Sequence, residues 1–114
     1  MGCYSVIEHD LYLKAYKKLS KSNKNISKDI DNFLDTIESK DDLGIHLKQN
    51  VYKVRIINSA KNKGKSSGYR LISYLMIVKN ELHLLYIYDK SKIENITEKQ
   101  LDSLIIQQLQ DCLD

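Results

Sequence analysis

The chain has 114 residues, of which 42% are hydrophobic and 29% charged, a composition typical of one globular domain. No stretch approaches the 18 or so apolar residues of a membrane helix, the N-terminus lacks a signal-peptide pattern, and two cysteines are too few for a disulfide framework, so we expect a cytoplasmic protein. The net charge of +3 is unevenly distributed, because residues 43–80 contain eight of the 18 basic residues and no Asp or Glu. Such a surface attracts a polyanion or is simply a solvated basic face.

The first third of the chain predicts a strand and two helices. Residues 3–8 are short and β-leaning. Asp10 can cap a helix that separates four apolar residues from four lysines: Leu11, Ala15, Tyr16 and Leu19 against Lys14, Lys17, Lys18 and Lys21. After a polar turn, Ser27 can cap a second helix with apolar residues at helical spacing: Ile30, Phe33, Leu34 and Ile37. The two helices predict a hairpin with one apolar side.

The remainder predicts three strands and a last helix. Residues 38–50 read as a connection, and strands are expected at 51–57, 68–79 and 81–89, with a tight turn at 79–80. Thr97 and Gln100 fit a capping box, with Ile96 and Leu101 as its hydrophobic staple, and apolar residues follow at helical spacing: Leu104, Ile105, Leu109 and Leu113. The predicted fold is a single α+β domain, 1–114, in the order β-α-α-β-β-β-α. An antiparallel meander should be covered on one face by the helical hairpin.

The strand at 51–57 alternates between apolar and basic side chains. Three apolar residues share the face that suits a core: Tyr52, Val54 and Ile56. Lys53 and Arg55 point to the other face. If the 58–67 loop closes a symmetric hairpin, Arg55 lies opposite Arg70 and Lys53 opposite Ile72.

Arg55 and Arg70 are the only arginines in the chain. Like charges that face each other across two strands repel, so their pairing predicts an anion between them. Arginine grips phosphate through two parallel hydrogen bonds, which makes phosphate the expected anion. The alternative is that each arginine pairs with a carboxylate, which the C-terminal helix could supply.

Other motifs predict no further chemistry. Gly64-Lys65-Ser66 matches the end of a P-loop, but Ser59 stands where the first glycine belongs and a strand follows, so a basic loop that tracks a nucleic-acid backbone is expected instead. The three histidines, His9, His46 and His83, lack ligand spacing, so we expect no metal and no cofactor, and His83 should be a hydrogen-bonded structural residue. Cys3 and Cys112 are expected to be small buried hydrophobes. Three tyrosines line the core or stack on bases: Tyr74, Tyr86 and Tyr88.

Three segments carry a family resemblance: "YKVRI" (52–56), "KGKSSGYRLISYL" (63–75) and "LLYIYDKS" (84–91). They resemble the RelE/HigB group of the RelE/ParE superfamily, the toxins of type II toxin–antitoxin systems. The resemblance covers roughly 51–105 and implies a ribosome-dependent mRNA endonuclease (mRNA interferase) of RelE-like fold. It also implies a cognate antitoxin, typically a helix-turn-helix protein, and the ribosome and mRNA as partners.

The resemblance assigns the work to basic residues of the middle strands and their loops. The catalytic residues it implies are Lys53, Arg55, Lys65 and Arg70, and the RNA-binding residues are Lys61, Lys63, Lys90, Lys92 and Tyr74. The expected reaction is metal-independent attack of the RNA 2′-hydroxyl on the adjacent phosphate. The arginines would stabilise the added negative charge, and a lysine crowded by cations would take the proton.

The end of the chain departs from the family pattern. Some relatives place a catalytic tyrosine there, whereas "KIENITEKQ" (92–100) contains neither tyrosine nor histidine. Two alternatives therefore stay open. One is a ParE-like toxin that poisons DNA gyrase without cutting RNA, and the other is a non-catalytic module that binds RNA or the ribosome.

Overall fold

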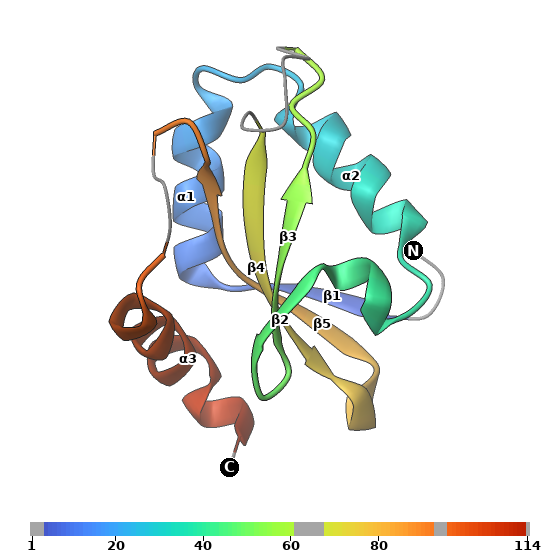
Figure 1. Ribbon diagram of the computed structural model, residues 1–114, viewed down its shortest axis with the longest axis vertical. Helices are drawn as coiled ribbons and strands as arrows, with labels where there is room; N and C mark the ends of the chain where they lie inside the picture. Colours follow the sequence, from blue (N-terminus) through green and yellow to red (C-terminus); the bar gives the residue numbers. More distant parts are fainter. Residues whose placement is uncertain (1–3, 61–67, 93–95, 114) are drawn as a thin grey trace.

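The computed structural model describes residues 4–60, 68–92 and 96–113, with side chains described as far as Leu109 (Figure 1). Its elements in chain order are β1 (Ser5–Glu8), α1 (Asp10–Ser20), α2 (Ile26–Thr36), the 3₁₀ helix η1 (Lys40–Leu43), β2 (Ile45–Lys48), β3 (Val51–Ile56), β4 (Tyr69–Met76), the 3₁₀ turn η2 (Ile77–Lys79), β5 (Glu81–Asp89) and α3 (Glu98–Leu113). The predicted α+β class is confirmed, and every predicted element is present with one strand added. Within the described residues, no helix combines the length and the apolar character needed to cross a bilayer.

Five strands form one sheet in the order β1-β5-β4-β3-β2. The strands from β2 to β5 pair antiparallel, and β1 pairs parallel with β5 at one edge. The predicted meander of three strands is thus confirmed, with β4 in the middle of the sheet. β4 ends at Met76 rather than at residue 79, because the chain turns through η2 and closes on Asn80, whose φ is 52°.

Strand β2 corrects the prediction that residues 38–50 are only a connection. Its four residues include a single β-branched one, Ile45, so the sequence carries no clear strand signal there. The strand forms because the chain can fold back onto β3. Gly44, at φ 95°, approaches the Lys53 carbonyl so closely that a Cβ would collide with it, and Gln49 takes a positive φ in the turn that follows.

The starts of both N-terminal helices differ from the predicted caps. His9 is the N-cap of α1 and Asn25 that of α2, and neither side chain makes a capping hydrogen bond. Asp10 is the first residue of α1, and Ser27 is the second residue of α2. Asp10 still suits its position, because a carboxylate in the first turn is favoured by the helix dipole.

The hairpin of α1 and α2 covers one face of the sheet, as predicted (Figure 1). Tyr12 of α1 and Ile26 and Ile30 of α2 are buried there, against residues of three strands, β3, β4 and β5: Tyr52, Ile56, Tyr69, Leu71, Leu75, Leu82, Leu84 and Ile87. We call this the first face. Tyr12, which the sequence analysis did not single out, is 1% exposed, and Ala15, Tyr16 and Leu19 of the predicted apolar face pack against the same core.

The second face of the sheet is covered by α3. The buried residues of this smaller core are Val51, Ile72, Tyr74, Leu85 and Tyr88 of the strands with Leu101, Ile105 and Leu109 of the helix. The Thr97–Gln100 capping box is confirmed, with hydrogen bonds of 2.9 and 3.1 Å. Gln108 holds the helix to the body, because its amide accepts from the Leu11 N–H (2.9 Å) and donates to the Leu85 carbonyl (2.8 Å).

Candidate nucleic-acid interface

Two rows of side chains cross the second face where β3, β4 and β5 lie side by side. The register gives their members as Arg55, Arg70 and Tyr88, which we call the arginine row, and Lys53, Ile72 and Tyr86, which we call the lysine row. The pairings predicted for the β3–β4 hairpin are confirmed. They follow from the two-residue period of a strand, because Tyr52, Val54 and Ile56 belong to the first face.

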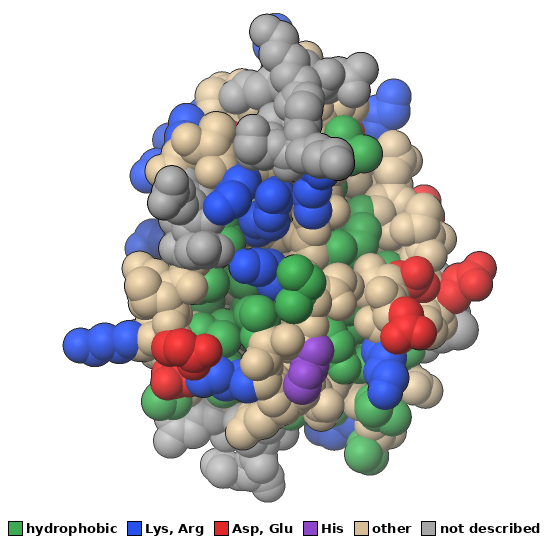
Figure 2. All heavy atoms as spheres, in the orientation of Figure 1, with side chains coloured by type: hydrophobic (Ala, Val, Ile, Leu, Met, Phe, Trp, Pro, Cys, Tyr) green, Lys and Arg blue, Asp and Glu red, His purple; other side chains and the backbone are tan. Residues whose placement is uncertain are grey.

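The arginine row holds two positive charges face to face. Arg55 is exposed and Arg70 is half-buried, and Arg70 donates a long hydrogen bond of 3.3 Å to the Tyr69 carbonyl. Burial, and then the neighbouring Arg55, lower the pKa of Arg70 from its ordinary value. Arginine nevertheless keeps its charge at any physiological pH, so the repulsion persists. Figure 2 shows basic side chains gathered on this face of the molecule. An anion at the row would relieve the repulsion.

Two acidic residues of α3 are engaged with β2. Glu98 and Asp102 form ion pairs with Lys48 at 2.7 and 2.5 Å. Hydrogen bonds to Asp102 and Glu98 raise the pKa of Lys48. These two carboxylates therefore hold the start of α3 against the edge strand.

The other predicted site residues lie at different places. The Lys90 N–H donates to the Gly68 carbonyl (3.0 Å), which sets Lys90 beside the start of β4. Lys92 lines a cavity between α1 and β5 together with Lys18. Tyr74 is 7% exposed beneath α3 and meets His83 edge-on, so its ring is not on the surface. Three predicted lysines fall outside the described residues: Lys61, Lys63 and Lys65.

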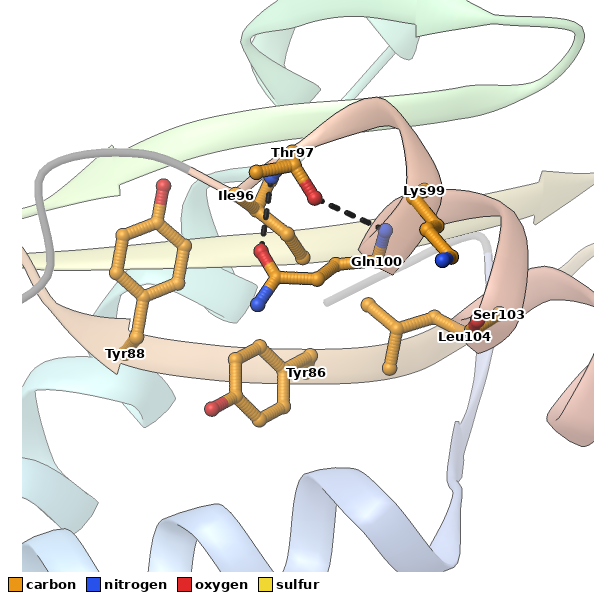
Figure 3. Close-up of a pocket in the computed structure, with 8 residues that line it drawn as sticks. All are labelled: Tyr86, Tyr88, Ile96, Thr97, Lys99, Gln100, Ser103 and Leu104. Atoms are coloured by element: carbon orange, nitrogen blue, oxygen red, sulfur yellow. Dashed lines mark hydrogen bonds between the residues drawn. The ribbon is translucent and has the colours of Figure 1, made fainter.

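A cavity of about 450 Å³ opens between β5 and the start of α3 (Figure 3). We call it the tyrosine pocket, and its lining residues are Tyr86, Tyr88, Ile96, Thr97, Lys99, Gln100, Ser103 and Leu104. The centroids of the two tyrosine rings are 6.1 Å apart, and the rings are tilted by 31°. Burial raises the pKa of Tyr88, and Arg70 acts against that rise. The pocket thus directly adjoins both rows, because each row ends on one of its tyrosines.

Sequence reasoning missed this pocket and a pair of histidines. The nitrogens His9 Nε2 and His83 Nδ1 are 2.6 Å apart, and His83 Nε2 lies 3.0 Å from the Glu81 carboxylate. Since a carboxylate only accepts, His83 donates to Glu81 and accepts from His9. His83 is 2% exposed, which confirms it as a hydrogen-bonded structural residue. Nothing in the sequence links two histidines 74 residues apart. Among the described residues, no group of three His, Cys, Asp or Glu side chains could hold a metal ion.

The chain matches no protein-family model and no curated protein sequence. Its fold is similar to solved structures of the toxin RelE from E. coli. The isolated RelE toxin is 18% identical with a TM-score of 0.52, over 89% of this chain and 95% of that chain. A double mutant of RelE in the free state is 20% identical with a TM-score of 0.51, over 81% and 88% of the two chains. The chain therefore has a RelE-like fold.

Proposed function

We propose that this protein is the toxin of a type II toxin–antitoxin system and cleaves mRNA on the translating ribosome. The observation that carries the proposal is the arginine row, in which two like charges are paired on one face of a RelE-like sheet. Such a pairing lowers the stability of the fold, and a polyanion that binds there offsets the repulsion. The proposed activity belongs to the cytoplasm, where translating ribosomes are found.

The chemistry needs no metal ion or cofactor. The 2′-hydroxyl of one ribose attacks the adjacent phosphate and loses its proton, and the bond to the 5′-oxygen of the next nucleotide breaks. This oxygen takes up a proton, so the products are a 2′,3′-cyclic phosphate and a 5′-hydroxyl end. Negative charge grows on the phosphoryl oxygens in the transition state, where fixed cations stabilise it. Arg55 and Arg70 are the residues proposed for this role, since two guanidinium groups on adjacent strands can bracket one phosphate.

The remaining roles follow the position of each residue. A base must accept the 2′ proton, and Lys53 of the lysine row or Lys65 is proposed for it. Lys61, Lys63, Lys90 and Lys92 would contact the RNA backbone. The proposed partners are mRNA, the ribosome and a cognate antitoxin of the helix-turn-helix type.

The test is to incubate the purified protein with mRNA, with and without translating ribosomes, and to map the cut ends. Cuts at codons in the ribosomal A site are expected from the wild-type protein and lost in Arg70→Ala. Lys79→Ala is the matched control, because it also removes one cation but lies in η2, at the opposite end of β4. Intact RNA in every wild-type reaction would overturn the proposal.

One observation favours a second candidate, a ParE-like toxin that inhibits gyrase. Residues 93–114 contain neither tyrosine nor histidine, so the last helix brings no aromatic acid or base to the arginine row. A supercoiling assay with DNA gyrase separates the two candidates. Blocked supercoiling together with intact RNA would support the gyrase inhibitor.

A further inference from the structure

The capping box at the start of α3 fixes the side chain of Gln100 in one orientation. The Gln100 Oε1 accepts a hydrogen bond from the Thr97 N–H at 2.9 Å, and only an oxygen can accept there. The NH₂ group of the same amide must then lie on the other side. In Figure 3 that nitrogen faces the space beside the rings of Tyr86 and Tyr88. The tyrosine pocket therefore presents hydrogen-bond donors that helix capping holds in place.

The walls of the pocket suit a flat aromatic ligand. Tyr86 is only partly buried and offers a ring face, and Ile96 and Leu104 close the sides with apolar groups. The volume of about 450 Å³ lies in the range of small-molecule sites. Stacking on an exposed aromatic ring stabilises the binding of a base and tolerates any base. Discrimination between bases must then come from the polar groups of the pocket.

The pocket also lies where a nucleotide of bound RNA would reach it. Tyr88 belongs to the arginine row and Tyr86 to the lysine row, so the pocket begins one strand away from Arg70. Neighbouring strands are about 4.8 Å apart. Lys99, at the rim of the pocket, adds another cation for the backbone. An RNA chain with one phosphate bound at the arginine row can therefore place a neighbouring base in the pocket.

We propose that the tyrosine pocket binds one nucleobase of the RNA and that Gln100 selects bases with a keto oxygen over bases with an amino group. Uracil O4 and guanine O6 accept hydrogen bonds, whereas cytosine N4 and adenine N6 donate them. The Gln100 NH₂ matches the first pair and opposes the second. This inference rests on the proposed function in that it takes RNA to be the ligand of the arginine row.

The test compares the binding of two pentanucleotides, U₅ and C₅, by fluorescence anisotropy. Their bases differ in the group at position 4 and in the protonation of the adjacent ring nitrogen. The wild-type protein is expected to bind U₅ about threefold to tenfold more tightly, since one hydrogen bond contributes about 0.5–1.5 kcal/mol. Equal affinity for the two would overturn the inference.

Three variants assign the preference to the amide. Gln100→Glu keeps the capping box, because glutamate serves equally at that position, but it replaces the donor by an acceptor and should reverse the ratio. Gln100→Leu should bring the ratio near one. Gln107→Glu adds the same charge on an exposed position of α3 outside the pocket and should keep the wild-type ratio. A ratio in Gln100→Glu equal to that of the wild type would exclude Gln100 as the selecting residue.

Cleavage mapping of the same variants separates this inference from the proposed function. Wild-type cleavage with a base preference that Gln100→Glu leaves unchanged would overturn the pocket inference and leave the nuclease intact. A Gln100-dependent ratio in a protein that cuts no RNA would overturn the nuclease and leave the pocket. If neither pentanucleotide binds, the pocket inference fails, and the cleavage map alone decides the proposed function.

Discussion

The two faces of the sheet are built from the same strands and differ in what covers them. The first face lies beneath two helices and carries the larger of the two hydrophobic cores. The second face lies beneath α3. Its core includes Ile72 and Tyr88, and next to them β3 and β4 carry Arg55 and Arg70 of the arginine row. Adjacent residues such as Arg70 and Leu71 therefore belong to different faces. In a strand, one residue can stabilise the fold while the next binds a ligand.

Residues of the first face are expected to determine stability, and residues of the arginine row are expected to determine activity. Leu71 is fully buried, whereas Arg70 is half-buried beside a like charge. Substitutions on the first face should cost stability, and substitutions at the arginine row should cost activity. Variants of the two faces should therefore differ most in the free energy of unfolding.

The largest loss of stability is expected for Leu71→Ala. The side chain is 0% exposed in the core of the first face, and truncating a buried leucine costs about 2–5 kcal/mol. Urea unfolding followed by circular dichroism measures the change. Val78→Ala is the matched control, because Val78 is 95% exposed and should tolerate truncation. A loss below about 1 kcal/mol for Leu71→Ala would mean that the first face is not the dominant core.

Gly44→Ala should come next, with a loss of about 1–3 kcal/mol. Gly44 has φ 95° and ψ −144°, a conformation nearly restricted to glycine, and a Cβ would collide with the Lys53 carbonyl. The strain falls on β2, whose Lys48 holds Glu98 and Asp102 of α3. Amide hydrogen exchange should therefore show faster exchange in β2 and in the first turn of α3. Lys40→Ala, an exposed change in η1, is the control. Unchanged exchange in both elements would contradict the coupling.

A smaller effect is expected from pH, through the histidine pair that joins the start of α1 to β5. Burial, and then the electrostatic influence of His83, lower the pKa of His9 below its ordinary value of 6.5, with Asp10 acting in the opposite direction. The unfolded chain therefore binds a proton that the folded chain resists, and the stability that neutral His9 contributes is lost as the pH falls from 6.5 through its lowered pKa.

The measurement is urea unfolding of the wild type and of His9→Gln, each at about pH 7.5 and about pH 5. Glutamine can still donate to His83 but does not titrate, so the variant should lose less stability on acidification. An equal loss in both proteins would exclude His9 as the source.

The arrangement of the strands followed from the sequence better than the site did. The β3–β4 register was predictable because the alternation of Lys53 and Arg55 with apolar residues and one symmetric hairpin define it. β2 was missed because it has only four residues and a single β-branched one, and because the approach of Gly44 to β3 depends on tertiary structure. The histidine pair was missed because its members are distant in the sequence.

The tyrosine pocket was predictable from the sequence only in part. The sequence predicted that Thr97 and Gln100 cap a helix, and it left Tyr86 and Tyr88 either in the core or at a binding surface. Only the docking of α3 beside β5 brings the amide and the rings together. The same docking buries Tyr74, the one of the three tyrosines that the family resemblance had named as an RNA-binding residue. Local patterns specify elements, whereas a pocket between two elements depends on how they pack.

The smallest change in the free energy of unfolding is expected at Arg70, one of the two arginines proposed to act in cleavage. Arg70→Leu removes a charge that faces Arg55, and a like-charge pair across two strands costs about 0.2–1 kcal/mol, reduced here by solvent screening. The variant should therefore be as stable as the wild type or slightly more stable in urea unfolding. Loss of one preorganised donor to the phosphate should lower the cleavage rate about 10²–10³-fold.

Arg70→Lys sharpens the same comparison. It keeps the charge and the repulsion, so its stability should equal that of the wild type, but lysine cannot form the two parallel hydrogen bonds of a guanidinium group. Its cleavage rate should fall between those of the wild type and Arg70→Leu. If Arg70→Leu instead unfolds as readily as Leu71→Ala, the two residues serve the same core, and the second face is not divided between packing and binding. A fully active Arg70→Leu would remove Arg70 from the proposed site while leaving the packing of the sheet as described.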